Sequence, residues 1–173
     1  MLFSKLLDLP FDSGTNKIDL RSIRSALPAT PLAVSCQVYE AHGRNSAFQA
    51  LYGSLDIQKV KWQLRSMRAS TLCRSSYNPL YASWVESVTR RLETFQKQGW
   101  HCVDRRNDVA EHWGNFQSWQ TPPVLILGKF LPSKPNFHFV EGHTRLGVLR
   151  GLLEHKVLAQ SSRHLVWLGC CTD

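Results

Sequence analysis

The sequence predicts an α+β fold, a small mixed β-sheet with packed helices that is preceded by a helical N-terminal extension. Apolar residues recur at helical spacing before Asp56, whereas alternating or short continuous apolar runs, typical of strands, appear only after it. From residue 57 onward the segments follow the order strand, helix, strand, strand, helix, strand, which indicates helices layered on one sheet. We therefore expect a helical extension over residues 1–56 and a second domain over residues 57–173.

The extension is expected to contain several short helices. Its first helical pattern ends before the prolines at 28 and 31, and two further short helices between residues 34 and 52 are separated by a turn near Gly43. The segment from Tyr39 to Gly43 is polar enough to be functional, but helix packing closed by a C-terminal glycine is the favoured interpretation. The apolar positions of the first pattern are Ile18, Leu20, Ile23 and Leu27.

The second domain begins with a half-buried strand at residues 60–64, where apolar and polar side chains alternate. A helix follows from Trp84 to a stop near Gly99, and residues 100–121 have no clear pattern. Short apolar runs predict strands at 122–127 and 137–142, joined in a hairpin-like unit by a loop at 128–136. A helix at 144–154 and a strand at 164–169 complete the domain.

Composition and charge narrow the function classes. The 173 residues are 43% hydrophobic, which suits one domain with a sizeable core. The longest apolar runs are too short to span a bilayer and the N-terminal segment lacks the pattern of a secretory signal, so we expect no membrane association and a cytoplasmic location. Five scattered cysteines fit a reducing compartment, and without paired Cys-x-x-Cys units we expect no zinc site and assign no metal-ligating residue.

The turn from the 137–142 strand into the 144–154 helix is the best candidate site. Gly142 permits a tight turn, and the backbone N–H groups at the start of a helix bind anions. Arg145 offers a planar fork that suits phosphate oxygens, and Glu141 is placed to act as a general base or to hold a metal ion near the phosphates. The alternative is purely structural, with Thr144 as a helix cap and Arg145 paired with a surface carboxylate.

The turn Gly142-His143-Thr144-Arg145 resembles that of the ParB/sulfiredoxin superfamily, in which sulfiredoxins carry Gly-Cys-His-Arg and ParB proteins Gly-Glu-Arg-Arg. The stretches NPLYASWVESV, PPVLILGKF and VWLGCCT are also similar to family segments, so the resemblance covers about residues 57–173. It implies a nucleotide-binding scaffold in which residues 142–145 cradle phosphates while Ser83 and Ser87 contribute hydroxyls. The implied cofactors are a nucleoside triphosphate (ATP or CTP) and Mg²⁺. Ordinary exposed helix serines are the alternative for Ser83 and Ser87.

The sequence departs from the family pattern at two points, and each departure removes one family function from those expected here. His143 stands where sulfiredoxins have their reactive cysteine, so reduction of cysteine sulfinic acid is not expected. ParB proteins continue into a helix-turn-helix domain, whereas this sequence ends at Asp173, and centromere-type DNA binding is not expected either.

Three functions remain open. The first is a nucleotide-dependent phosphotransferase or hydrolase that uses Glu141, His143 and Arg145 as catalytic residues. The second is a non-catalytic nucleotide-sensing module that contacts a protein partner through the helices of residues 1–56. The third is a nucleic-acid-binding protein or nuclease, which the formal net charge of +8 favours.

Overall fold

The computed structural model describes residues 1–131 and 136–171, except for the side chain of Cys171. It confirms the α+β class: the strands form a five-stranded mixed sheet and a separate two-stranded sheet, accompanied by helices. The chain divides into two compact units. The first comprises residues 1–64, 124–141 and 167–173, and the second comprises residues 65–123 and 142–166. No helix among the described residues is both long and apolar enough to cross a membrane.

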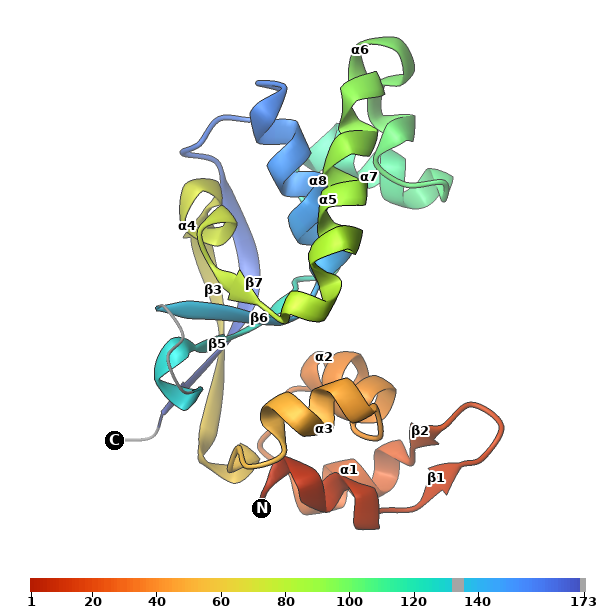
Figure 1. Ribbon diagram of the computed structural model, residues 1–173, viewed down its shortest axis with the longest axis vertical. Coiled ribbons are helices and arrows are strands. Elements are labelled where there is room, and N and C mark those ends of the chain that lie inside the picture. Colours follow the sequence, from red (N-terminus) through yellow and green to blue (C-terminus); the bar gives the residue numbers. More distant parts are fainter. Residues whose placement is uncertain (132–135, 172–173) are drawn as a thin grey trace. The chain divides into compact units, whose positions relative to one another are not determined.

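The N-terminal part of the first unit is helical, as predicted (Figure 1). The side chain of Asp19 caps one helix by accepting from the Ser22 amide, and the side chain of Asn45 caps another. The apolar faces of these helices supply fully buried core residues that include Phe3, Ile23 and Phe48. The elements are η1 (Phe3–Asp8), α1 (Leu20–Ala26), α2 (Leu32–Val34), the π-helical turn η2 (Ser35–Glu40), α3 (Ser46–Tyr52) and η3 (Ile57–Lys59).

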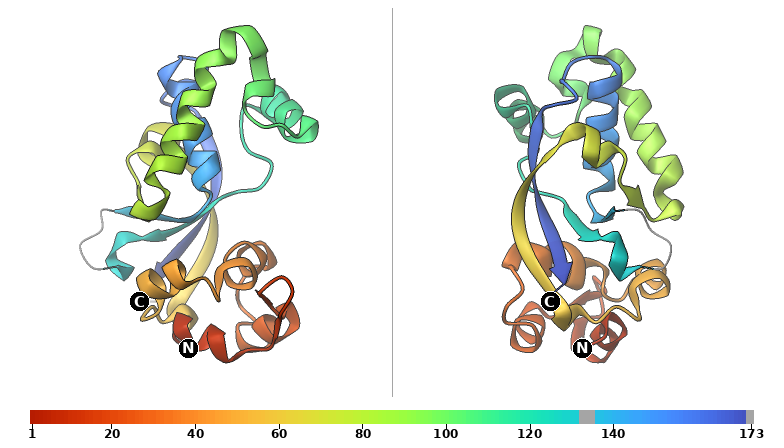
Figure 2. Two further views of the ribbon diagram at one scale, coloured as in Figure 1. Left: turned by 45° about the vertical axis from the view of Figure 1, so that its right-hand side comes forward. Right: turned by 90° about the vertical axis from the view of Figure 1, so that its left-hand side faces the viewer.

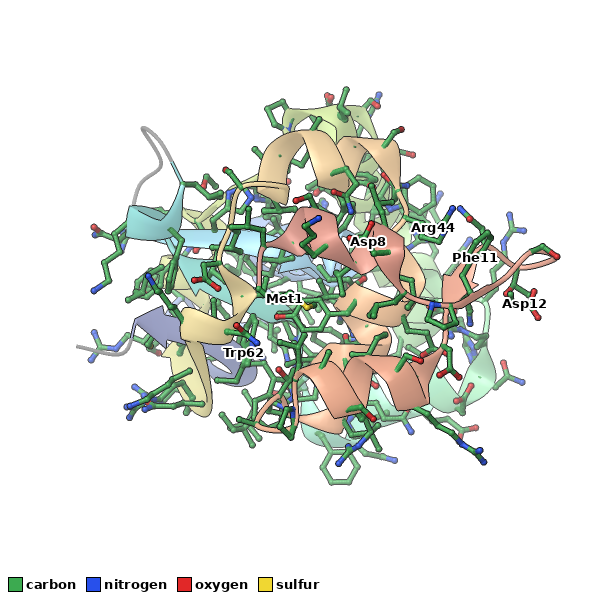
Figure 3. All side chains as sticks on the ribbon, turned by 90° about the horizontal axis from the view of Figure 1, so that it is seen from below. Met1, Asp8, Phe11, Asp12, Arg44 and Trp62 are labelled. Carbon is green, nitrogen blue, oxygen red and sulfur yellow. The ribbon has the colours of Figure 1, made fainter. Side chains whose placement is uncertain are left out.

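A small hairpin between η1 and α1 was not predicted. Its strands, β1 (Phe11–Asp12) and β2 (Lys17–Ile18), are antiparallel and too short to show an alternating pattern. The guanidinium of Arg44 covers the hairpin, with its Cζ 3.5 Å from the centre of the Phe11 ring (Figure 3). Arg44 also donates hydrogen bonds to the side chain of Asn16 and to the carbonyl of Leu7. A cation–π contact and two side-chain hydrogen bonds thus hold Arg44 against the hairpin, in addition to its own strand pairing.

Four strands of the main sheet run through the first unit in the order β3-β7-β5-β6. Strand β5 pairs antiparallel with β6 and parallel with β7, and its residues Val124 to Ile126 are fully buried, which explains the continuous apolar run. All four strands were predicted, although β3 and β7 are longer than expected. Their bounds are Val60–Arg68 for β3, Val124–Leu127 for β5, Phe137–Glu141 for β6 and Arg163–Cys171 for β7.

A register shift changes the direction of the last side chain of β6. Ile126 pairs with His138, Leu125 with Phe139, and Val124 with Glu141, so Val140 is the extra residue of a β-bulge. Strict alternation of side chains along the strand would place Glu141 on the same face as Phe139. The bulge instead places Glu141 on the face that carries His138, because directly paired residues share a face.

The segment between β5 and β6 was predicted to be a loop over residues 128–136. It begins with the short helix η7 (Gly128–Phe130), and the Gly128 amide donates to the Asn136 carbonyl. Residues 132–135 of the predicted loop lie outside the described part of the chain.

The second unit is built mainly from helices. The helix predicted from Trp84 to Gly99 is present but divided into three segments, and Gly99 ends it with a φ of +56°. The unassigned stretch 100–121 contains a further helix, α7. The elements are α4 (Ala69–Cys73), β4 (Ser76–Tyr77), which is the fifth strand of the sheet, η4 (Pro79–Tyr81), α5 (Ala82–Arg91), η5 (Leu92–Thr94), α6 (Phe95–Gln98), η6 (Gly99–Cys102), α7 (Asn107–Phe116) and α8 (His143–Glu154).

Helices α5 and α8 lie side by side at very short range (Figures 1 and 2). A Cβ atom added to Gly147 would lie 2.8 Å from the Val85 carbonyl oxygen, and one added to Gly151 would lie 2.6 Å from the Leu92 Cβ. The hydroxyl of Thr89 lies within hydrogen-bonding distance of two carbonyls, one on each helix. The two glycines therefore permit the backbones to approach closely, and no side chain fits between them.

A buried histidine joins β7 to the segment that follows α7. His164 is 1% exposed, and its two ring nitrogens lie 3.0 Å from the hydroxyls of Ser118 and Ser162. The rings of Trp113 and Trp119 surround it. Burial lowers the pKa of His164 to about 4, so the ring is neutral at physiological pH.

The glycine contact between α5 and α8 can be tested by Gly147→Ala. The added methyl group collides with backbone, so the free energy of unfolding should fall by about 1–3 kcal/mol, despite the better helix propensity of alanine. Urea denaturation followed by circular dichroism measures the change. Ser87→Ala, on the exposed face of α5, is the matched control and should change stability by less than about 0.5 kcal/mol. An unchanged Gly147→Ala protein would contradict the close packing.

His164 should make stability depend on pH. Its folded pKa of about 4 lies below the ordinary value of 6.5, so between these values the unfolded chain binds a proton that the folded chain does not. The free energy of unfolding should therefore fall as the pH decreases from about 6.5 to about 4. Denaturation curves across this range should show a smaller fall for His164→Gln, whereas His101→Gln, at an exposed position, should keep the parental slope. Equal slopes for all three proteins would show that His164 is not held neutral.

Candidate functional site

The predicted turn is present, and Gly142 is indispensable to it. Gly142 has a φ of +108°, which disfavours other residues, and a Cβ atom at this position would lie 2.4 Å from the Cβ of Pro123. It is the N-cap of α8 and provides no side chain to cap the helix. The first intrahelical bond runs from the Leu146 amide to the Gly142 carbonyl, so the preceding amides need acceptors from outside the helix. This refutes the alternative in which Thr144 caps the helix.

The side chain of His143 points into the protein. It is 7% exposed, stacks on the Tyr81 ring with the centroids 4.2 Å apart, and meets the edge of Tyr77. The sequence predicts a catalytic or phosphate-binding role for His143. A side chain enclosed by two tyrosines is better suited to holding the turn in place than to exchanging protons with a ligand.

Thr144 is joined to α5 by a hydrogen bond that the sequence did not reveal. The indole Nε1 of Trp84 donates to the Thr144 hydroxyl at 3.0 Å, across 60 positions of the chain. Trp84 nevertheless remains 51% exposed. An aromatic ring with half of its surface exposed is thus fixed beside the first turn of α8.

The guanidinium of Arg145 lies near the same turn. Its Nη1 donates to the Thr121 carbonyl at 2.9 Å, and its Nε is close to Gly142. The alternative, a pairing of Arg145 with a surface carboxylate, stays open beside this bond to the Thr121 carbonyl. Because a backbone carbonyl carries no net charge, the bond to Thr121 orients the guanidinium without neutralising it.

Ser83 and Ser87 lie one turn apart on the exposed side of α5, as the sequence suggested. The opposite side of α5, which includes Val85 and Val88, is buried. The structure records contact with the 142–145 turn for their neighbour Trp84, and it records none for these two serines. The roles of Ser83 and Ser87 stay predictions, and the residue of this helix with a recorded bond to the turn is Trp84.

Glu141 belongs to the first unit, where it lies close to a histidine. Burial lowers the pKa of His42, and the nearby Glu141 carboxylate partly opposes this shift. His42 stacks on Phe48 with the ring centroids 4.3 Å apart. On the same face of β6, the fully buried His138 is hydrogen-bonded to the hydroxyl of Tyr52 at 2.8 Å. The stacking of His42 and the burial of Tyr39 agree with the packing interpretation of residues 39–43, whereas the proximity of His42 to Glu141 depends on the tertiary fold.

Thiols and metal ligands contribute little to the candidate sites. Burial raises the pKa of Cys36, of Cys102 and of Cys73, the last to about 11, so none of these three is held as the reactive thiolate. Within residues 1–131 and 136–171 no group of three or more histidine, cysteine or acidic side chains is arranged to hold a metal ion.

The comparisons with known proteins do not identify a family for this chain. A scan of family models, a search of curated proteins and a search of solved structures each returned no match. The resemblance to the ParB/sulfiredoxin superfamily therefore depends on the motif residues alone and stays a prediction.

Proposed function

We propose that the second unit binds a nucleotide, with its phosphates at the N-terminus of α8. The observation that carries this proposal is the half-exposed indole of Trp84, fixed by Thr144 beside a helix start that has no side-chain cap. An anion site and an aromatic surface side by side are the two chemical features that a nucleotide requires.

The phosphate side of the proposed site consists of backbone and one cation. The amides of the first turn of α8 point away from the helix, and the helix dipole adds partial positive charge there. The guanidinium of Arg145 adds a full charge near Gly142. These groups suit a polyphosphate better than a carboxylate, because several oxygens can accept from them at once.

The base side of the proposed site is Trp84. Stacking of a nucleobase on an aromatic side chain contributes about 1–3 kcal/mol and tolerates different bases, so this contact favours nucleotides as a class without choosing ATP or CTP. Ser83 and Ser87 are exposed on the same helix and supply hydroxyl groups for the sugar or the phosphates.

Hydrolysis or phosphoryl transfer is the reaction we propose for this ligand. Glu141 directly precedes Gly142 in the chain and is the proposed general base, while Mg²⁺ bound to the phosphates would neutralise developing charge. His143 is assigned a positioning role, because it is enclosed by Tyr77 and Tyr81. The cytoplasmic location and the protein partner of the N-terminal helices stay predictions.

Replacement of either ligand-facing side chain should weaken nucleotide binding. Arg145→Ala removes a charge-assisted contact worth about 1.5–3 kcal/mol and Trp84→Ala removes a stacking surface of similar value, so each should raise the Kd for ATP or CTP about ten- to a hundredfold. Isothermal titration calorimetry in the presence of Mg²⁺ measures both. Arg90→Ala, an exposed arginine on α5, is the control for net charge and should bind as the parent does.

Parental affinity in both ligand-site variants would refute the proposed site. The nucleic-acid alternative predicts a different result. An oligonucleotide would then bind with an affinity that decreases steeply with salt, and Arg90→Ala would weaken binding as much as Arg145→Ala.

Glu141→Gln separates binding from turnover. The substitution keeps the shape of the side chain but removes the carboxylate that would accept a proton, so the Kd should change little while phosphate release falls by at least about a hundredfold. A phosphate-release assay with ATP and CTP checks this. A parent protein that binds nucleotide but releases no phosphate would instead support the non-catalytic module, and full activity of the variant would exclude Glu141 as the base.

A further inference from the structure

A second candidate binding site lies beside the contact between α5 and α8. It is an open cavity of about 290 Å³, just below the range of about 300–1,000 Å³ that is usual for ligand sites. Its lining residues are Tyr77, Ala82, Glu86, Thr89, Arg150 and Glu154. We propose that this cavity binds a free cationic amino acid, such as lysine, ornithine or arginine, through its α-carboxylate and its two cationic groups.

Arg150 is the proposed partner of the α-carboxylate. Its Nη2 donates to the Cys73 carbonyl at 3.0 Å, its Nη1 donates to the Tyr77 hydroxyl at 3.3 Å, and its Cζ lies 5.1 Å from the Tyr77 ring centroid. These contacts fix the plane of the guanidinium and use two of its five donors. A guanidinium held in this way is pre-organised for a planar carboxylate.

Glu86 and Glu154 are the proposed partners of the cationic groups. They lie on different helices, both line the cavity, and neither forms an ion pair with any residue that the structure describes. Glu154 is also the last residue of α8, where the helix dipole disfavours a carboxylate. Both carboxylates are exposed to solvent at the mouth of the cavity, so a ligand ammonium group can reach them, and one at Glu154 would offset the helix dipole.

The charge of the lining selects the class of amino acid. One guanidinium and two carboxylates give the cavity a formal charge of −1, which a ligand of charge +1 neutralises. An acidic amino acid would face both carboxylates, and a neutral one would leave one of them without a counter-charge. A cationic amino acid provides one cationic group for each carboxylate and its own carboxylate for Arg150.

The Cys73 thiol lies near the same charges. Burial raises the pKa of Cys73 to about 11, while Arg150 lowers it and Glu154 raises it, so both side chains act at this thiol. The neutral thiol does not compete with the ligand for Arg150. The proposed site therefore combines a fixed cation and two free carboxylates around one small volume.

An NMR titration of the ¹⁵N-labelled full chain tests this proposal with three probes: L-lysine, cadaverine, which lacks the carboxylate, and Nα-acetyl-L-lysine N-methylamide, which represents a lysine within a protein. L-lysine should shift the amide signals of α5 and α8 and bind at least about tenfold tighter than either analogue. Glu86→Gln and Glu154→Gln, on separate helices, should each weaken lysine binding by about tenfold or more. Glu93→Gln, an exposed carboxylate outside the lining, should leave it unchanged.

Three outcomes would overturn the proposal: no shifts with L-lysine at millimolar concentration, equal binding of either analogue, or parental affinity in both cavity variants. The proposed nucleotide site is tested separately, because Arg145→Ala should bind L-lysine as the parent does. Loss of nucleotide binding alone would therefore leave this proposal standing.

Discussion

The contact of α5 with α8 through Gly147 and Gly151 is the constraint on which the second unit depends. Because neither glycine has a side chain, the two backbones meet directly, and Thr89 forms polar contacts on both helices. The short distance between the two helices places Trp84, on α5, beside the beginning of α8. The same contact sets the spacing of the charged side chains that line the neighbouring cavity. Both proposed ligand sites therefore depend on the packing of α5 against α8.

The sequence predicted the elements whose apolar residues follow a clear period. The buried run of β5 and the capped helices of the N-terminal part are examples, because burial on a regular element leaves a regular pattern. Helix α7 was missed because its buried residues Ala110 and Trp113 are too few to stand out among polar neighbours. Two-residue strands such as β4 have no period at all and form only because a partner strand is present.

The sequence predicted only those features of the candidate site that depend on neighbouring residues in the chain. Gly142 could be recognised, since a strand that passes directly into a helix requires an unusual backbone conformation. The direction of Glu141 depends on the bulge at Val140, which is visible only from the pairing with β5. The bond from Trp84 to Thr144 joins distant parts of the chain, and no spacing rule within one helix would indicate it.

Tyr77 touches both His143 at the beginning of α8 and Arg150 two turns later. One phenol ring is thus shared by the residue that supports the turn and the residue that lines the cavity. Any ligand that displaces Arg150 must also change the environment of the ring, and through it the support of His143. If binding at Arg150 moves the Tyr77 ring, reciprocity requires that a ligand at the N-terminus of α8 change the affinity at Arg150 by the same free energy.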